Sequence, residues 1–254
     1  MRPAMRYFAC TISFFLLMLV GCDGGSRKHE PKNEASNSGE KKPACGRIGR
    51  LVLRLPVTDA FAGMIFEGSD PWKGETARTG STCGDRLQEA SIALTWPEML
   101  PTGASPGLPR VGGKETITLT FVPYVPESGG DQDLQHEAVR SIDFSTPNVA
   151  WERVTETKRL DPQLGLYCVQ GRSSVAFREV CWKEGADSGI STLVVCNKRP
   201  KVDPQLCRQV MLRPSEQMRI EIRYEGVLRP QWSLIERRAG EFLEDHVTSR
   251  GNEG

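Results

Sequence analysis

The stretch Met218-Arg-Ile-Glu-Ile-Arg-Tyr224 decides the fold class of this chain. Its apolar side chains alternate with charged ones, which is typical of a strand with one buried face and one face in water. Residues 114–125 repeat the pattern, with Ile117, Leu119 and Phe121 on one face and threonines on the other. Short connections between such strands favour antiparallel pairing.

The segment after this strand predicts a helix. Pro230 suits the first helical turn, where its missing N–H costs nothing. Trp232, Ile235 and Ala239 then begin an apolar stripe that continues through Phe242 or Leu243 to Val247. Further short strands are predicted at 51–55, 62–66, 91–96, 149–154, 164–169, 175–182, 190–196 and 206–212. The fold class is therefore α+β: an antiparallel β-rich domain, disulfide-stabilised, with a C-terminal amphipathic helix packed on the sheet.

The N-terminal residues predict export and lipid attachment. Arg2 and Arg6 precede an apolar run at 7–20, which is shorter than the ~20 residues that span a bilayer and suits a signal peptide. Leu19-Val-Gly-Cys22 then resembles the bacterial lipobox, whose cysteine thiol receives the lipid and becomes the new N-terminus. The alternatives are an ordinary signal peptide with a chance cysteine, or a short anchor helix.

We therefore expect a lipoprotein signal peptide at 1–21 and acylation of Cys22, with diacylglycerol and palmitate as the anchor. The protein would be held on the periplasmic face of the cell membrane. Asp23 follows the cysteine and resembles the enterobacterial signal for retention at the inner membrane, which is preferred here over the outer membrane.

Residues 22–44 predict a flexible tether that follows the lipidated cysteine. The segment consists mainly of Gly, Ser, Asn, Glu and Lys, with no large apolar side chain, so it cannot bury enough surface to offset its ordering entropy. A flexible chain of this length has an end-to-end distance of about 25 Å. The folded domain is expected at 45–250. A polar, loop-like segment at 126–134 leaves open two halves, 45–130 and 145–250.

The cysteines predict a disulfide set. Cys10 leaves with the signal and Cys22 carries the lipid, so six of the eight cysteines remain in the domain. An even number in an exported chain indicates disulfides, because the periplasm is oxidising. The most local scheme has these pairs: Cys196–Cys207 across a hairpin, Cys45–Cys83 and Cys168–Cys181. No C-x-x-C spacing and no neighbouring pair of histidines indicates a zinc site.

Composition and motifs limit the possible functions. Of 33 lysines and arginines, Arg2 and Arg6 leave with the signal, so 31 remain against 32 acidic residues, and the net charge is near −1. The chain therefore lacks the excess of basic residues that would suggest nucleic-acid binding. His29, His136 and His246 are widely separated, and no G-x-S-x-G or H-E-x-x-H motif is present. We expect no enzyme, cofactor or metal, although scattered carboxylates leave a paired-carboxylate hydrolase open.

Several segments together carry a family resemblance. They are Ile92-x-Leu94-x-Trp96-Pro97-Glu98-Met99, the cysteine-bearing strands, and the charged strand that runs into a Trp-containing terminal helix at 218–246, all behind a lipobox. The combination resembles the periplasmic immunity lipoproteins that accompany type VI secretion effectors, particularly lipases and phospholipases. The resemblance implies a non-catalytic protein that binds a secreted toxin effector and blocks it. No motif maps to an effector contact.

One residue is a candidate contact with such a partner. Trp72 stands in a polar loop marked by Gly and Pro, and an exposed aromatic residue there would be a suitable interface anchor; a core-facing tryptophan is the alternative. The second hypothesis for the whole protein is a structural or assembly lipoprotein of the cell envelope.

Overall fold

The computed structural model describes residues 44–56, 63–69, 82–103, 110–111, 114–126, 131–142, 150–172, 177–185, 189–198 and 205–249. The predicted signal peptide, the lipidation site Cys22, the tether before residue 44 and Trp72 lie outside the described residues. No helix within the described part is long and apolar enough to cross a bilayer.

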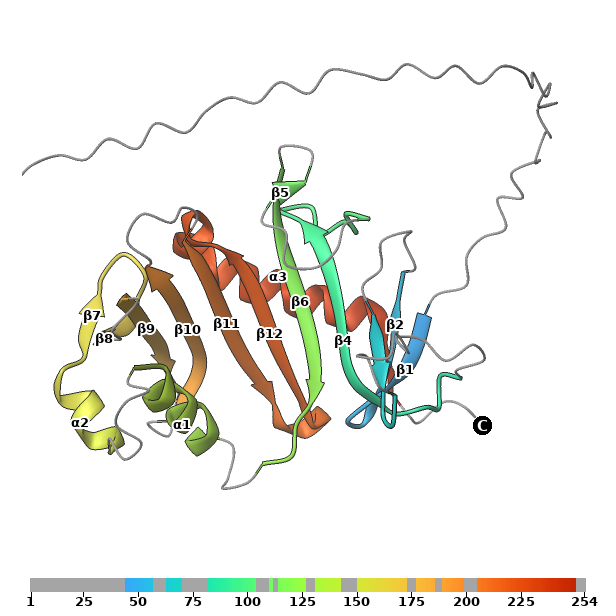
Figure 1. Ribbon diagram of the computed structural model, residues 1–254, viewed down its shortest axis with the longest axis horizontal. Helices are drawn as coiled ribbons and strands as arrows, with labels where there is room; N and C mark the ends of the chain where they lie inside the picture. Colours follow the sequence, from blue (N-terminus) through green and yellow to red (C-terminus); the bar gives the residue numbers. More distant parts are fainter. Residues whose placement is uncertain are drawn as a thin grey trace, which may run out of the picture. The chain divides into compact units, whose positions relative to one another are not determined.

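Ten antiparallel strands within the described residues form one large sheet (Figure 1). In spatial order, nine of these strands are β3 (Met64–Phe66), β4 (Leu87–Thr95), β6 (Lys114–Pro123), β12 (Met218–Glu225), β11 (Leu206–Arg213), β10 (Ile190–Lys198), β9 (Phe177–Glu184), β8 (Leu166–Arg172) and β7 (Arg159–Asp161). A tenth, β5 (Arg110–Val111), pairs with the start of β6. The predicted α+β class is confirmed. Strands from either side of residue 130 lie next to each other in this sheet, because β6 pairs with β12.

A second, small sheet contains β1 (Ala44–Ile48), β2 (Leu51–Leu55) and β13 (Val247–Ser249). The turn between β1 and β2 lies against the short 3₁₀ helix η2 (Pro214–Glu216), where Arg50 N–H donates to the Glu216 carbonyl at 3.0 Å. Gly49 has a φ of +54°, and a Cβ there would lie 2.3 Å from that same carbonyl oxygen. Only glycine fits both constraints.

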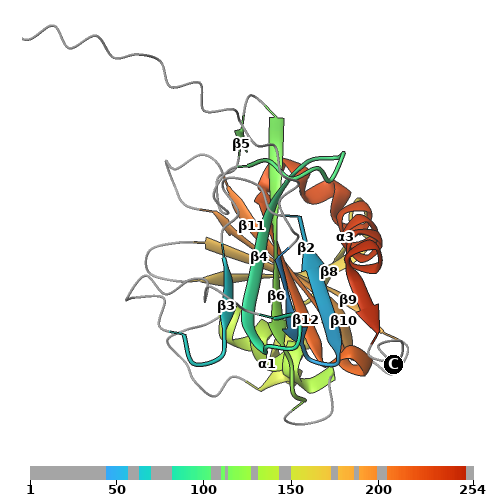
Figure 2. The ribbon, with the colours of Figure 1, turned by 90° about the vertical axis from the view of Figure 1, so that its right-hand side faces the viewer.

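One face of the large sheet carries the main core. The apolar residues of β4, β6 and β12 point to this face and are buried together with Leu53 and Leu55 of the small sheet. The helix α3 (Trp232–His246) covers it, and its predicted stripe of Trp232, Ile235, Ala239, Phe242 and Leu243 is buried. Figure 2 shows α3 and the small sheet on the same side of the large sheet.

Two details at the ends of this helix differ from the sequence prediction. Pro230 lies in a preceding 3₁₀ helix, η3 (Gly226–Gln231), and α3 begins at Trp232. Val247, expected on the helical stripe, belongs to β13. The backbone extends there because it pairs with Leu53 of β2.

The opposite face of the sheet is covered by helices that the sequence analysis missed. The segment read as a loop at 126–134 contains the start of α1 (Asp131–Ile142), and the strand expected at 149–154 is the helix α2 (Trp151–Glu156). Leu134 and Ala138, one helical turn apart, are buried on β8, β9 and β10. A Cβ at Gly171 would lie 2.5 Å from the Ile142 carbonyl oxygen, so glycine permits this close approach of α1 to β8.

Three disulfides cross-link the described residues. They are Cys45–Cys83, Cys168–Cys181 and Cys196–Cys207, the three pairs of the most local scheme. The last two join residues directly opposite each other in neighbouring strands, with Cα atoms 4.1 Å apart. The first connects β1 to the turn before β4. One disulfide therefore ties the small sheet to the segment before β4, and the other two join β8 to β9 and β10 to β11.

Candidate partner-binding site

The face of the large sheet that carries α1 changes from apolar to charged between β10 and β11. Strand pairing sets one row across the sheet, which runs Thr118, Arg223, Arg208, Val195, Val180 from β6 to β9. The apolar members lie in the cluster that α1 covers. The arginines lie beyond it, on strands whose other face packs under α3.

A pocket of about 640 Å³ lies at this border, between α1 and the sheet. Its lining includes five arginines, from α1, β9, β11 and β12: Arg140, Arg178, Arg208, Arg219 and Arg223. Hydroxyl groups of Thr116, Thr118 and Ser141 and the apolar side chains of Val195 and Leu206 belong to the same lining. The volume lies in the range of small-ligand or side-chain binding sites.

Glu137 of α1 connects the helix to two of these arginines. Its carboxylate lies 2.5 Å from Nη2 of Arg208 and 2.8 Å from Nη2 of Arg219. Glu221 of β12 also lies 2.8 Å from Nη2 of Arg219, with longer contacts of 3.7 Å to Arg208 and 3.9 Å to Arg223. Carboxylate and guanidinium groups therefore alternate across two strands and one helix.

The arginines are close enough together to repel one another. Arg208 and Arg223 are directly opposite in the β11–β12 ladder, a placement that destabilises a sheet when the charges are alike. Burial and the neighbouring Arg208 guanidinium lower the pKa of Arg178 from its ordinary value. Among the described residues, Glu137 and Glu221 are shared by Arg208, Arg219 and Arg223, so these three guanidinium groups outnumber the two carboxylates.

This arrangement is suited to recognising an anionic group. Guanidinium groups stay protonated and present paired N–H donors to carboxylate or phosphate oxygens. An arginine side chain offers five N–H donors and no acceptor, so the lining favours binding of an anion over acid–base chemistry.

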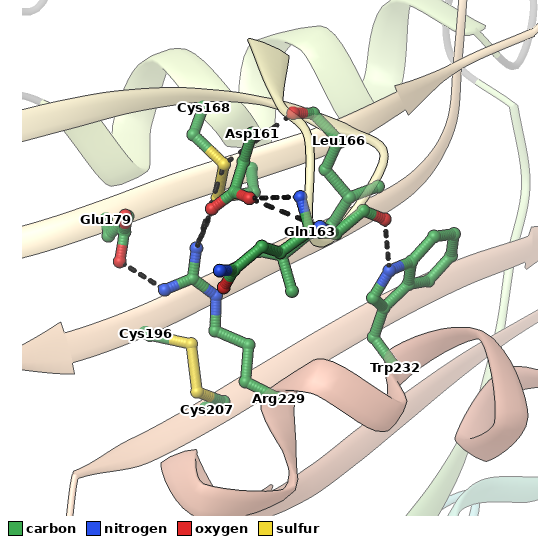
Figure 3. The surroundings of a disulfide bond; sticks show 11 residues. Asp161, Gln163, Leu166, Cys168, Glu179, Cys196, Cys207, Arg229 and Trp232 are labelled. Atoms are coloured by element: carbon green, nitrogen blue, oxygen red, sulfur yellow. Dashed lines mark hydrogen bonds and ion pairs between the residues drawn. A yellow bond between two sulfur atoms is a disulfide. The ribbon is translucent and has the colours of Figure 1, made fainter. Parts of the chain in front are cut away.

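A second polar cluster surrounds the Cys168–Cys181 disulfide (Figure 3). Arg229 of η3 donates to the Glu179 carboxylate at 2.5 Å, and its Nη2 lies 3.3 Å from Sγ of Cys181 and 3.8 Å from Asp161. Trp232 N–H donates to the Leu164 carbonyl at 2.8 Å. These contacts attach η3 to β7 and β9, and the first residue of α3 to the β7–β8 turn.

The same cluster brings two cysteines and one glutamate within ligand distance of one another, Cys168, Glu179 and Cys181. The two sulfur atoms are bonded to each other, so they offer no thiolates to a metal. The Arg229 guanidinium already supplies positive charge to the Glu179 carboxylate. A hollow of about 720 Å³ lies beside this cluster, lined mainly by residues of β7 and β8. We interpret the cluster as structural.

The residues singled out from sequence lie mostly away from the arginine pocket. Cys207, on the disulfide-bonded strand β11, is part of the pocket lining. Cys22 and Trp72 lie outside the described residues. His136 is exposed on α1, and His246 stacks on Phe242 at the end of α3 with ring centroids 4.0 Å apart. Trp96 of the resemblance motif is buried and donates to the Gln231 side chain at 3.1 Å.

The five arginines were missed as a site. Arg219 and Arg223 were assigned to the wet face of their strand, but Arg140, Arg178 and Arg208 come from segments whose neighbours are set by long-range pairing. The sequence signal that could have pointed to them is the repeated arginine on the polar face of 218–224.

The chain matches no protein-family model and no curated protein at a significant level. Among solved structures it is similar to Smlt3025, described as an immunity protein of the Stenotrophomonas maltophilia type IV secretion system. The two chains share 13% identity with a TM-score of 0.49, over 82% of this chain and 94% of Smlt3025.

Proposed function

We propose that the mature chain is a lipid-anchored periplasmic protein that neutralises a secreted toxin effector by binding to it. The lipobox ending at Cys22 and the tether after it support a membrane anchor with a reach of about 25 Å. The three disulfides of the domain suit an oxidising compartment.

The observation that carries the proposal is the arginine-lined pocket on a cross-linked sheet. Its side chains recognise anions and are held by α1 and by neighbouring strands. A rigid surface of this kind loses little conformational entropy on binding, which favours affinity. A standard protein interface buries about 1,600 Å², and the open face around the pocket would form part of it.

The segments that resemble immunity lipoproteins suggest the class of effector. They favour a toxin of type VI secretion with lipase or phospholipase activity. Inhibition would then consist of covering the toxin's active site, with the lipid anchor keeping the protein close to the membrane that such a toxin attacks.

Contact killing tests the proposal directly. A strain lacking this gene, grown on a surface with its parent, should be outcompeted, and a plasmid copy should restore survival. A parent strain without its type VI apparatus should no longer kill the mutant. Equal survival of mutant and wild type beside the parent strain would show that the protein is not an immunity factor.

The anchor is tested separately with Cys22→Ala. We expect this variant to leave the membrane fraction and to lack the mass of the lipid, because the thiol that carries the diacylglycerol is gone. Cys10→Ala, in the predicted signal peptide, is the matched control and should not change fractionation. Unchanged membrane association of Cys22→Ala contradicts lipid anchoring at this residue.

A further inference from the structure

Among the described residues of the arginine pocket, Arg208, Arg219 and Arg223 share two carboxylates. Glu137 is shared between Arg208 and Arg219, and Glu221 makes its short contact with Arg219 as well. Nη2 of Arg223 lies 3.9 Å from the Glu221 carboxylate, and 62% of the Arg223 side chain is exposed. Arg140 is also exposed, at the rim on α1. These two guanidinium groups face solvent where a ligand would enter.

The position of Glu137 shows how a carboxylate fits this surface. It projects from α1 and lies between arginines of two neighbouring strands, with contacts of 2.5 and 2.8 Å. Arg223 is directly opposite Arg208 in the ladder, so a second carboxylate reaching Arg223 would extend the same alternation of charges. It would also relieve the repulsion between the opposed arginines.

Three features favour a protein carboxylate over a nucleic acid or a lipid headgroup. Glu137 and Glu221 are interspersed among the arginines, and they would repel a continuous row of phosphates. The pocket of about 640 Å³ holds a few side chains rather than a polymer backbone. Val195 and Leu206 add apolar surface to its lining, and Leu206 is 49% exposed.

We propose that this pocket binds the carboxylate side chains of an acidic segment of the partner protein, through Arg140 and Arg223 at its entrance. The inference rests on the proposed function for the identity of the partner as the toxin. The preference for carboxylates follows from the residues of the pocket alone. An acidic segment would also be steered toward the pocket over long range, with an association rate that falls as salt increases.

Fluorescence anisotropy with a labelled hexaglutamate peptide tests the site on the purified mature domain. The pocket variant is the double substitution R140E/R223E. Its matched control is R237E/R238E, which makes the same charge change at exposed positions of α3, on the opposite side of the sheet. We expect the pocket variant to bind hexaglutamate at least about tenfold more weakly, and the control to stay within about twofold of wild type.

Each alternative has its own outcome. Equal weakening in both variants would show that hexaglutamate responds to overall charge, and no binding to wild type would also overturn the proposal. Inorganic phosphate or a short oligothymidylate binding more tightly than hexaglutamate would identify a phosphate site instead. Thermal unfolding of every variant checks the fold, and R140Q/R223Q provides a milder change if the charge reversal prevents folding.

The result is independent of the contact-killing experiment. Loss of protection in the gene deletion, without hexaglutamate binding, would keep the proposed function and reject this site. Hexaglutamate binding at the pocket, without any protection, would keep the site and reject the toxin as its partner.

Discussion

The carboxylate of Glu137 on α1 lies 2.8 Å from Nη2 of Arg219 on β12, joining a helix to a strand more than eighty residues away in the chain. Both side chains are largely withdrawn from water, with 11% and 26% of their surface exposed. This ion pair holds α1 beside the charged half of the sheet and defines one wall of the arginine pocket.

Removing the charge of Glu137 should therefore destabilise the domain. Glu137→Gln leaves Arg208 and Arg219 without their shared carboxylate, and breaking a fully buried pair costs about 3–5 kcal/mol. Because this pair is partly exposed, we expect a loss of about 2 kcal/mol in the free energy of unfolding, measured with urea. Glu244→Gln, at an exposed position of α3, is the control and should change stability by less than about 0.5 kcal/mol.

The core face of the sheet could be predicted from the sequence because its burial repeats every second residue. Met218, Ile220 and Ile222 belong to the core that α3 covers. Their alternation predicts this buried face without any knowledge of which strands lie beside β12. The helix α1 could not be predicted the same way. Its buried side includes Glu137 and Ser141 as well as Leu134 and Ala138, so its apolar stripe is too narrow to stand out.

The arginines of the pocket are brought together by the order of the strands in the sheet. Local sequence patterns do not contain this order. Arg223 was correctly placed on the polar face, but its opposition to Arg208 follows from the β11–β12 pairing and register. Arg219 and Glu221 were expected in water; their side chains are only 26% and 14% exposed, because Glu137 of α1 packs over them. A helix absent from the prediction thus changed the environment of a strand that was predicted well.

Arg229 and Glu179 form an ion pair beside the Cys168–Cys181 disulfide, with only 14% of each side chain exposed (Figure 3). Arg229→Met should lower the free energy of unfolding by about 3 kcal/mol, because the partly buried Glu179 carboxylate stays in place without the Arg229 guanidinium. Adding Glu179→Gln to that variant should recover part of the loss. A double variant less stable than Arg229→Met alone would contradict this account.

The disulfides should contribute unequally to stability. Cys45–Cys83 closes a segment with a sequence separation of 38, against 11 for Cys196–Cys207. In the loop-entropy description, replacing both cysteines by serine should cost about 4 kcal/mol for the longer loop and about 3 kcal/mol for the shorter one. Urea unfolding of the two paired-serine variants measures the difference. The opposite order would show that strain or packing at the cross-strand site outweighs loop entropy.

Tyr224 should make the domain less stable in alkali. Burial raises the pKa of its phenol above the ordinary value of 10.0, against a smaller opposing effect of the Arg229 guanidinium on that pKa. The folded state therefore keeps the proton at a pH where the unfolded chain releases it, so the contribution of Tyr224 is fully present below about pH 10 and is lost as the pH rises above that value. The loss is about 1.4 kcal/mol per pH unit until the folded-state pKa is reached.

The matched comparison is Tyr224→Phe. The phenol donates to the Gln209 side-chain oxygen at 3.3 Å, so the variant should be about 1 kcal/mol less stable at neutral pH. Between pH 9 and pH 11, the wild-type protein should lose about 1.4 kcal/mol relative to the variant, because phenylalanine has no proton to release. Urea midpoints at both pH values measure this change, and absorbance at 295 nm reports the ionisation itself. If the stability difference between the two proteins is the same at pH 9 and pH 11, Tyr224 titrates alike in the folded and unfolded states.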